Sequence, residues 1–532
     1  MRARHSPRRV LTALLGPAVL SLVVSGMLPL AHSAPATSPA SAPSGQRIPH
    51  LTIAIGSGVE NLDLPHTATV RNVAVANLVT EELFRINPKT GDLLPGLVES
   101  WELSADGLTY TLRLRRGVKF HDGTPFNAES VKFNILRFIA PETRARFGWL
   151  LAEVKDVEAA DEHTVRITLK QPYAPFLANL NYRTGMGSPT QMRRLGRDYA
   201  RHPIGTGPFR FVEFKKDAHV RLEANRDYWG GRPTADRVTL LLVAEEATRV
   251  ALLEAGQADI IVEFPPVDRQ RLERDARFRV EMSPSTSVTV IDLNTQWGPL
   301  RDRRVRQALN HAVNRQEILT HVMLGAALEA KSVITPGVFG YAPQQGYAHD
   351  PNRARQLLVE AGQGNGFAFK VTYRPGRYLN DAQLLETVQG YLSRVGVKME
   401  LNPMEGAAYN KAIEAPFEQN RTQAALIGRG AGTLDGDLTI SRFHSKRWPP
   451  ATTFVTFYKN GRVDSLIEEQ GRVRDPRRRF AILAEIQRLL MWDAVWIYLV
   501  NPSHLVAAKR QIQGFEMFPN EKFLLHQVTL AR

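Results

Sequence analysis

Apolar and polar residues alternate along several short segments of the chain, a pattern that predicts half-buried β-strands. After an Asp-Gly turn, leucine and tyrosine alternate with threonine and arginine over residues 108–114, which predicts a hairpin with one buried face. The same alternation accompanies turns in Asp161–Leu169 and His202–Phe214. Two further segments are mostly or wholly apolar: Leu51–Gly56 predicts a buried strand that enters a loop, and Val495–Val500 predicts a fully buried strand.

Apolar residues recur at helical spacing in other segments. Asp302–Leu319 predicts an amphipathic helix, and Asn380–Val395 is also predicted to be helical. Asp475 and Pro476 supply an N-cap and a first-turn proline for a third helix, whose apolar residues recur every three or four positions as far as Leu490. Because strand and helix patterns follow one another along most of the chain, we expect α/β lobes.

A histidine and an aspartate are neighbours at residues 121 and 122, and such a pair invites a catalytic interpretation. The surrounding residues account for the segment without chemistry. Asp122–Pro125 has the composition of a tight turn, and Asn127 is a good N-cap for the helix that follows. No serine stands nearby in a nucleophile-elbow spacing. We therefore predict that His121 and Asp122 form a structural corner.

The first 33 residues differ from the rest of the chain. Four arginines precede an apolar run, Val10–Leu30, which glycine and proline interrupt and which ends in small residues. This layout predicts a secretory signal peptide over residues 1–33, cleaved after Ser33, and a flexible lead-in over residues 34–46. A membrane anchor is the alternative, but the helix breakers favour cleavage. The arginine pair at positions 8 and 9 leaves open whether export uses the Sec or the twin-arginine route.

Length, charge and composition narrow the class of protein. The 532 residues exceed one ordinary core, so two or more lobes are expected. Subtracting the four arginines of the signal from the net charge of +15 leaves +11. Basic residues are interleaved with acidic ones and the chain carries an export signal, so a solvated surface is favoured over nucleic-acid binding. The chain has no cysteine, so a lipid anchor attached to cysteine is excluded. We therefore expect a free periplasmic protein rather than a lipoprotein.

Motifs for metal, phosphate or covalent chemistry are missing from the sequence. The 14 histidines are scattered, and none lies in an H-E-x-x-H motif. The GTGPF segment lacks the Lys-Ser/Thr of a P-loop, Gly428–Thr433 misses the dinucleotide spacing, and the mature chain has no G-x-S-x-G elbow. We therefore predict no cofactor, no metal site and no enzymatic activity.

Charged residues stand beside irregular backbone in the second half of the chain. Arg374–Arg377 directly follows a predicted strand, and Ala425–Trp448 opens from another strand into a loop rich in arginine, glycine and aspartate. Strand ends that open into loops are where α/β folds bind ligands. The alternative interpretation is that both segments are solvated loops.

Together, these segments resemble the solute-binding proteins of bacterial importers for peptides, nickel and opines. The similarity extends through nearly the whole mature chain, and its order and spacing make it specific although each segment is modest alone. The segments that carry it are Leu93–Phe133, His202–Phe211, Asn225–Pro233, Leu300–Ile318 and Leu434–Ser445.

The resemblance implies a class II type periplasmic binding protein, an α/β fold of two lobes with an additional subdomain inserted in lobe I. Lobes of this kind close on solute by a hinge motion and present the closed surface to a membrane permease. A monomer without cofactor or nucleic-acid partner is expected. Mapped onto this chain, lobe I covers 47–80, 205–293 and 505–532, the inserted subdomain covers 81–204, and lobe II covers 294–504.

Peptide binders of this family are expected to hold the ligand's amino group with an aspartate and its carboxylate with an arginine. Arg374 fits the position of the arginine, and Arg377 is a near alternative. The aspartate position falls near Gly432, which has no charge, whereas Arg429 offers a cation. This departure favours an anionic solute, such as a modified peptide, a glutathione-like compound or an opine. The predicted ligand-binding residues are Arg374, Arg377, Arg429, Gly430, Asp435, Asp437 and Trp448.

Three other functions compete with this prediction. A nickel-chelate or haem receptor of the same fold would need His444 or Trp448 in the cleft. A secreted hydrolase would need a nucleophile with a base in hydrogen-bond reach, and no motif supplies one. A nucleic-acid binder would show steep salt dependence.

Overall fold

The computed structural model describes residues 46–67, 69–87 and 90–531. The predicted signal peptide and all of the predicted lead-in except Gln46 lie outside the described residues. No helix in the part of the chain that is described is both long and apolar enough to cross a membrane.

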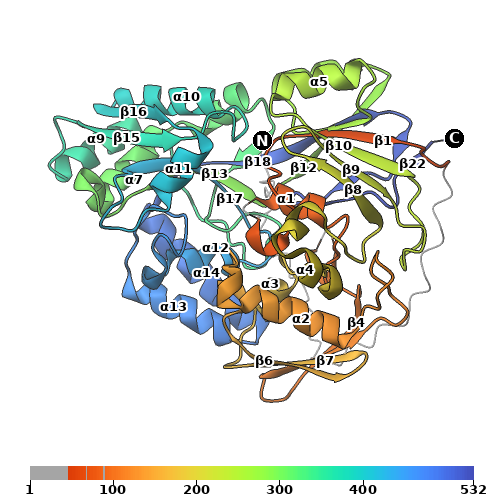
Figure 1. Cartoon of the computed structure of the whole chain (residues 1–532). Coiled ribbons are helices and arrows are strands. Elements are labelled where there is room, and N and C mark those ends of the chain that lie inside the picture. The colour runs from red at the N-terminus through yellow and green to blue at the C-terminus, as the bar shows by residue number, and fades with distance from the viewer. Residues whose placement is uncertain (1–45, 68, 88–89, 532) are drawn as a thin grey trace, which may run out of the picture.

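A 12-stranded mixed sheet runs through the molecule in the order β16-β15-β17-β13-β18-β11-β1-β10-β9-β8, and β12 and β14 also pair with β18. In Figure 1, β15 and β16 lie on the left and β1, β8, β9 and β10 on the right. The strands are β1 Leu51–Ile55, β8 Phe209–Lys215, β9 His219–Ala224, β10 Arg237–Leu242, β11 Ile260–Val262, β12 Phe278–Pro284, β13 Ser287–Leu293, β14 Ala327–Glu329, β15 Phe367–Tyr373, β16 Val397–Pro403, β17 Ala424–Gly430 and β18 Trp496–Lys509.

Strand β18 belongs to both halves of this sheet. Its first residues, from Trp496 to Val500, pair antiparallel with β13, and its residues from Ser503 to Lys509 pair with β12. Strand β11 pairs with the same distal portion from the other side. The continuously apolar segment at Val495–Val500 is therefore a buried strand, as predicted, and it continues for longer than the apolar pattern indicates.

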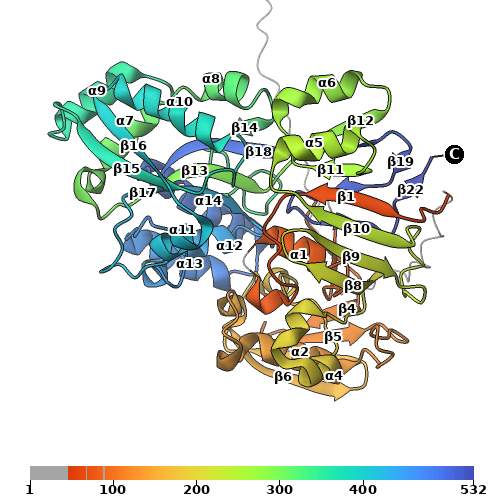
Figure 2. The same ribbon diagram turned by 45° about the horizontal axis from the view of Figure 1, so that its top comes forward.

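The half of the sheet around β1 is covered by helices α1 (Val70–Ala76), α5 (Glu246–Glu254) and α6 (Arg269–Arg274). Strand β1 is parallel to both β10 and β11, so the carboxyl ends of these three strands meet at one edge. Figure 2 shows α5 and α6 beside β11 and β12. The buried strand predicted at Leu51–Gly56 is confirmed, because β1 lies between β10 and β11 in this half and only Thr52 is partly exposed.

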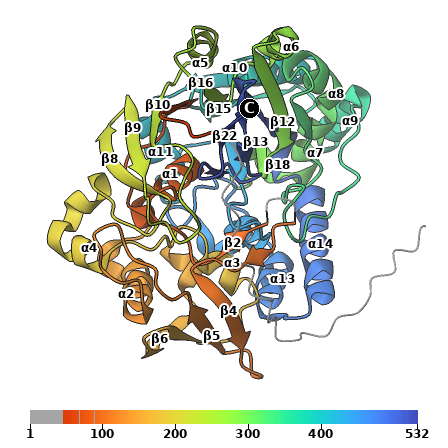
Figure 3. The same ribbon diagram turned by 90° about the vertical axis from the view of Figure 1, so that its right-hand side faces the viewer.

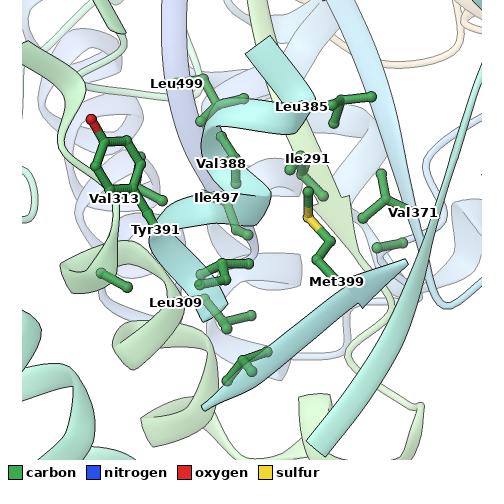
Figure 4. Close-up of a cluster of buried hydrophobic side chains, with 14 of the residues drawn as sticks. Ile291, Leu309, Val313, Val371, Leu385, Val388, Tyr391, Met399, Ile497 and Leu499 are labelled. Carbon is green, nitrogen blue, oxygen red and sulfur yellow. The ribbon is translucent and has the colours of Figure 1, made fainter. Parts of the chain in front are cut away.

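The other half packs helices on both faces of the sheet. Figure 4 shows α10 pressing Leu385 and Val388 toward Ile291 and Ile497 of the sheet. On the opposite face, the large side chain of Trp496 is buried among residues of α13 and α14. The helices of this half are α7 Arg303–Ala312, α8 Arg315–Glu317, α9 Pro351–Glu360, α10 Asp381–Ser393, α11 Gly406–Ile413, α12 Asp437–Ile440, α13 Gly461–Arg472 and α14 Pro476–Trp492.

One predicted helix is wrong in its extent. The pattern over Asp302–Leu319 predicts a single helix, but α7 ends at Ala312 and a new turn begins after Asn314. The buried guanidinium of Arg315 explains the break, because it donates to the carbonyl oxygens of Asn310 (3.0 Å) and Val313 (3.3 Å), which the end of α7 leaves free.

A separate four-stranded antiparallel sheet, β4-β5-β7-β6, has its own hydrophobic core. It lies below the large sheet in Figure 2, and Figure 3 shows the β4-β5 hairpin at the bottom of the molecule, as residues 108–114 predict. These elements fall within the predicted inserted subdomain, although the residue boundaries of the lobes stay a prediction. The elements are β4 Val98–Leu103, β5 Thr109–Leu114, α2 Ala128–Ile139, β6 Val154–Asp161, β7 Thr164–Leu169, α3 Phe176–Leu180 and α4 Pro189–Leu195.

Short strand pairs complete the described chain. Two of them lie near the carboxyl terminus and one precedes β4. They are β2 Arg85–Ile86 with β3 Leu93–Leu94, β19 Ile512–Gln513 with β22 Thr529–Leu530, and β20 Glu516–Met517 with β21 Phe523–Leu524.

His121 and Asp122 form a structural corner here, as predicted. The imidazole Nε2 lies 2.9 Å from the carbonyl oxygen of Gly207, while the Asp122 carboxylate accepts hydrogen bonds from Thr124 and Ser188. Asn127 caps α2 through a capping box with Ser130. The pair is therefore engaged in holding loops together rather than with each other.

Replacing His121 with glutamine should make the protein less sensitive to acid. Burial lowers the pKa of His121 to about 4, against about 6.5 in an unfolded chain, so protonation favours unfolding as pH falls below 6.5. Between pH 7 and pH 5, this coupling of protonation to unfolding lowers the free energy of unfolding by about 2 kcal/mol. Urea titrations of wild type and His121→Gln at both pH values would measure it. An equal loss in the two proteins would contradict the prediction.

Candidate ligand-binding cleft

The carboxyl ends of six strands surround a cavity of about 950 Å³ between the two halves of the large sheet. Residues that directly follow β1, β10, β11, β15 and β16, together with the last residues of β17, line its walls. Ser503 and His504, where β18 passes from one half to the other, line it as well. This placement is the one that α/β folds use for ligands.

Four of the predicted ligand-binding residues line this cavity: Arg374, Arg377, Arg429 and Gly430. Arg374 and Arg377 lie in the loop after β15, and neither forms a salt bridge within the described residues. Arg429, near the end of β17, donates to the carbonyl oxygen of Thr453 at 2.7 Å. The cleft therefore presents guanidinium groups that are largely uncommitted to acids.

The other three predicted residues lie outside the cavity lining. Asp435 accepts two hydrogen bonds from Arg479, at 2.6 and 2.7 Å, and both side chains are buried. Asp437 accepts from the hydroxyl of Tyr173 at 2.6 Å. Trp448 donates its indole N–H to the carbonyl oxygen of Tyr458 at 2.9 Å and packs on Phe417 and Phe457. In this structure the three side chains hold the wall of the cleft together.

The backbone at Gly432 leaves no room for a side chain. A Cβ atom there would lie 2.3 Å from the ring of Tyr182, which comes from the segment after α3. An aspartate at this position is therefore excluded by packing as well as by sequence. Tyr182 is itself buried, and its hydroxyl accepts from Arg183 at 2.9 Å.

An acidic group of residues on the side of β11 and α5 was not found from the sequence. Glu263, directly after β11, has a left-handed backbone (φ +57°), and the buried Arg249 holds its carbonyl oxygen. Arg71 forms an ion pair with the Glu263 carboxylate. Burial would raise the pKa of Glu263, but Arg71 and Arg249 outweigh burial and lower it. Burial raises the pKa of Glu246 to about 7.

Further cleft residues missed by sequence reasoning are Arg442 and Arg447, which follow α12, and the aromatic side chain of Trp149. Nothing in the local sequence distinguishes these arginines from the many exposed ones, because their partners come from distant segments. No group of three or more His, Asp or Glu residues suited to a metal ion occurs within the described ranges. His444, which a metal or haem receptor would need in the cleft, instead lies 3.2 Å from Glu468 and outside the lining.

Residues 92–449 match the family described as bacterial extracellular solute-binding proteins, family 5 (middle). The chain belongs to this family. The glutathione-binding protein GsiB of Pectobacterium atrosepticum is 31% identical over 483 residues, which cover 90% of this chain and 94% of that protein.

Two solved structures of solute-binding proteins agree with this family assignment. The periplasmic binding protein DppA of Helicobacter pylori, in complex with the peptide STSA, has a TM-score of 0.82 and 25% identity over 92% of this chain and 99% of its own. MoaA of Agrobacterium tumefaciens R10, in complex with mannopinic acid, has a TM-score of 0.81 and 25% identity over 91% of this chain and 100% of its own.

These similarities confirm the two-lobe α/β fold and the family that the sequence resembles. This family-5 protein is accordingly a periplasmic solute-binding protein of an ABC importer, and its relatives are binding proteins rather than enzymes. The cavity between the lobes is its candidate ligand-binding cleft.

Proposed function

We propose that this family-5 protein captures a peptide-like solute that carries a carboxylate and delivers it to the permease of an ABC importer. The observation that carries the proposal is the set of cleft arginines without a salt-bridge partner among the described residues, Arg374, Arg377 and Arg429. Arginine is suited to this task because its planar guanidinium can hold a carboxylate through two parallel hydrogen bonds.

The chemistry of the relatives supports this class of solute. By their names, one relative binds glutathione and two structural neighbours hold a peptide and mannopinic acid, and all three ligands carry a carboxylate. The family resemblance assigns the carboxylate to Arg374, which lines the cleft with its guanidinium against the backbone of Gly406. Tyr378 and Tyr409, which also line the cleft, offer the neighbouring polar surface.

Closure of the two lobes would enclose the solute. Chain crossings between β12 and β13 and within β18 are the hinge candidates, since Ser285, Ser287 and His504, which lie beside these crossings, line the cavity. The ion pair between Arg146 and Glu414 already joins segments on opposite sides of the cavity. A solute stabilises the closed state only through contacts that exist there and are absent from the open state. The proposal includes a monomeric mature protein exported by the signal peptide of residues 1–33.

Arg374→Gln should weaken binding of a carboxylate-bearing solute by about 1.5–3 kcal/mol, which corresponds to a loss of about 10- to 150-fold in affinity. The variant loses one charged hydrogen-bonding group and leaves the ligand's carboxylate unpaired in the cleft. Isothermal titration calorimetry of the refolded, ligand-stripped protein with glutathione and acidic dipeptides would measure the change.

His121→Gln is the matched control, because residue 121 lies outside the cavity lining and should leave affinity unchanged. Unaltered affinity in Arg374→Gln would remove this arginine from the site. Absence of binding to every carboxylate-bearing peptide would contradict the proposed function, and turnover of a peptide would indicate a hydrolase instead.

A further inference from the structure

Three arginines come together on one wall of the cleft. Arg429 lies near the end of β17, Arg442 lies in a short 3₁₀ turn at Ser441–Phe443, and Arg447 lies in the next turn at Ser445–Arg447. All three line the cavity. We call Arg429, Arg442 and Arg447 the arginine wall.

Aromatic rings hold the arginine wall in place. The guanidinium carbons of Arg429 and Arg442 lie 4.8 and 5.5 Å from the ring centre of Phe454. That of Arg447 lies 4.2 Å from the ring centre of Trp149. Stacking on a ring fixes the plane of a guanidinium and leaves the N–H groups at its edge available for hydrogen bonds, one of which Arg429 already donates to Thr453.

No acid neutralises this wall at close range. Within the described residues, none of the three arginines has a carboxylate oxygen within salt-bridge distance. Two carboxylates of neighbouring segments are committed elsewhere: Asp435 pairs with Arg479, and Glu414 pairs with Arg146. Asp292, which interacts electrostatically with Arg429, is fully buried and accepts from the backbone N–H of Val455 and the indole N–H of Trp496.

The positive charge of the arginine wall affects the pKa of Arg442. Burial, and then the positive charges of Arg429, Arg183 and Arg447, lower the pKa of Arg442 to about 9. The group is still protonated at neutral pH, so the wall carries repulsive positive charge in the ligand-free state. The Nε of Arg429 is buried without a hydrogen-bond partner. Both observations describe a site that an oxyanion would complete.

The opposite side of the cleft is lined by several glutamates. Glu245, Glu246 and Glu263 line it near the start of α5 and the end of β11. Arg374 and Arg377 lie on a separate element, the loop after β15. The cleft thus offers one carboxylate position at Arg374 and a second anionic position at the arginine wall.

We propose that the arginine wall binds a second carboxylate of the solute, so that the protein selects peptide-like solutes with two separate carboxylates. This inference rests on the proposed function and narrows its class of ligand. It assigns to Arg442 the role of distinguishing a dicarboxylate from the corresponding monocarboxylate.

Two matched pairs of probes test the inference by calorimetry on the stripped full chain. The first pair is glutathione and its glycine monoethyl ester, and the second pair is Ala-Glu and Ala-Gln. Wild type should bind the diacid of a pair at least about tenfold more tightly than its partner. Arg442→Gln should reduce this preference to less than about threefold and leave affinity for the monoacid within about twofold. Arg374→Gln should weaken Ala-Glu and Ala-Gln alike, because both dipeptides keep the carboxyl-terminal carboxylate that is assigned to Arg374.

The ligand-free protein provides an independent readout. Because Arg442→Gln removes an uncompensated cation, its melting temperature without ligand should rise by a few degrees while its affinity for the diacid falls. Lys446→Gln is the matched control: Lys446 lies on the same segment, but its side chain is 81% exposed, so both quantities should remain unchanged. Arg447→Gln is a second variant that should also reduce the preference for the diacid.

The outcomes separate the two proposals. Equal affinity of wild type for diacid and monoacid, or an unchanged preference in both Arg442→Gln and Arg447→Gln, would overturn the second-carboxylate site while leaving the receptor function intact. If wild type binds no member of either pair, the proposed function fails, and this inference fails with it.

Discussion

Replacing Arg479 with methionine should lower the free energy of unfolding by about 3–5 kcal/mol. The variant removes both hydrogen bonds to Asp435 and leaves a carboxylate that is only 10% exposed without its cation. It also removes the bond from Arg479 to Gln470 at 3.0 Å. Equilibrium unfolding in urea would measure the loss.

Two further variants make this prediction specific. Adding Asp435→Asn to Arg479→Met should recover a large part of the stability, because the double variant no longer buries an unpaired charge. Arg478→Met, which alters an exposed arginine paired with Glu469, should change stability by less than about 0.5 kcal/mol. A double variant as unstable as the single one would show that the pair does not act through charge. Ligand binding by the double variant at wild-type affinity would assign Asp435 to the scaffold rather than the site.

Arg249→Met should destabilise the protein by about 4 kcal/mol and also weaken ligand binding. Arg249 is 1% exposed and donates to the carbonyl oxygens of Val243, Ala244 and Glu263. Removing the donor of a buried carbonyl oxygen costs about 1–3 kcal/mol, and these three carbonyl oxygens are partly buried, so the total should be about 4 kcal/mol. The lost hydrogen bond to Glu263 affects the cleft directly. The left-handed backbone of Glu263 and its ion pair with Arg71 depend on the position that Arg249 gives to this residue.

Arg249→Lys is the informative comparison. Lysine keeps the positive charge, but its ammonium group cannot donate to all three carbonyl oxygens as the planar guanidinium does. We therefore expect the stability of Arg249→Lys to lie between those of wild type and Arg249→Met, and ligand binding to be weakened. Urea unfolding and calorimetry on both variants would separate charge from geometry. Wild-type stability in Arg249→Met would contradict the role of the anchor.

The candidate cleft residues that can be predicted from the sequence are those that lie at the end of a strand. Arg374, Arg377, Arg429 and Gly430 follow or end predicted strands, and the fold brings them to the cavity for that reason. The predicted corner at His121 could be recognised because its turn and its helix cap are contiguous in the chain.

The positions of the other candidate residues, inside and outside the cleft, depend on partners that are distant in sequence. Asp435 is committed to Arg479, 44 residues away, and nothing beside Asp435 indicates this pairing. Arg442 is significant only because Phe454 and Arg429 approach it in space. The break after α7 likewise depends on where one buried side chain, that of Arg315, directs its N–H groups. Contacts between residues that are distant in sequence leave no periodic pattern in the sequence, so they could not be predicted from it.

Strand β18 has a consequence for the order in which the protein folds. Its 14 residues pair with β13 and β14 in one half of the sheet and with β11 and β12 in the other. The first half therefore cannot complete its hydrogen bonds before residue 502 has been synthesised, nor the second before residue 509. Pairings this distant in sequence form slowly, because a long loop must close before they contribute. Both lobes should therefore become native together and late. Such delayed folding suits a chain that, on the proposed function, crosses a membrane before it folds.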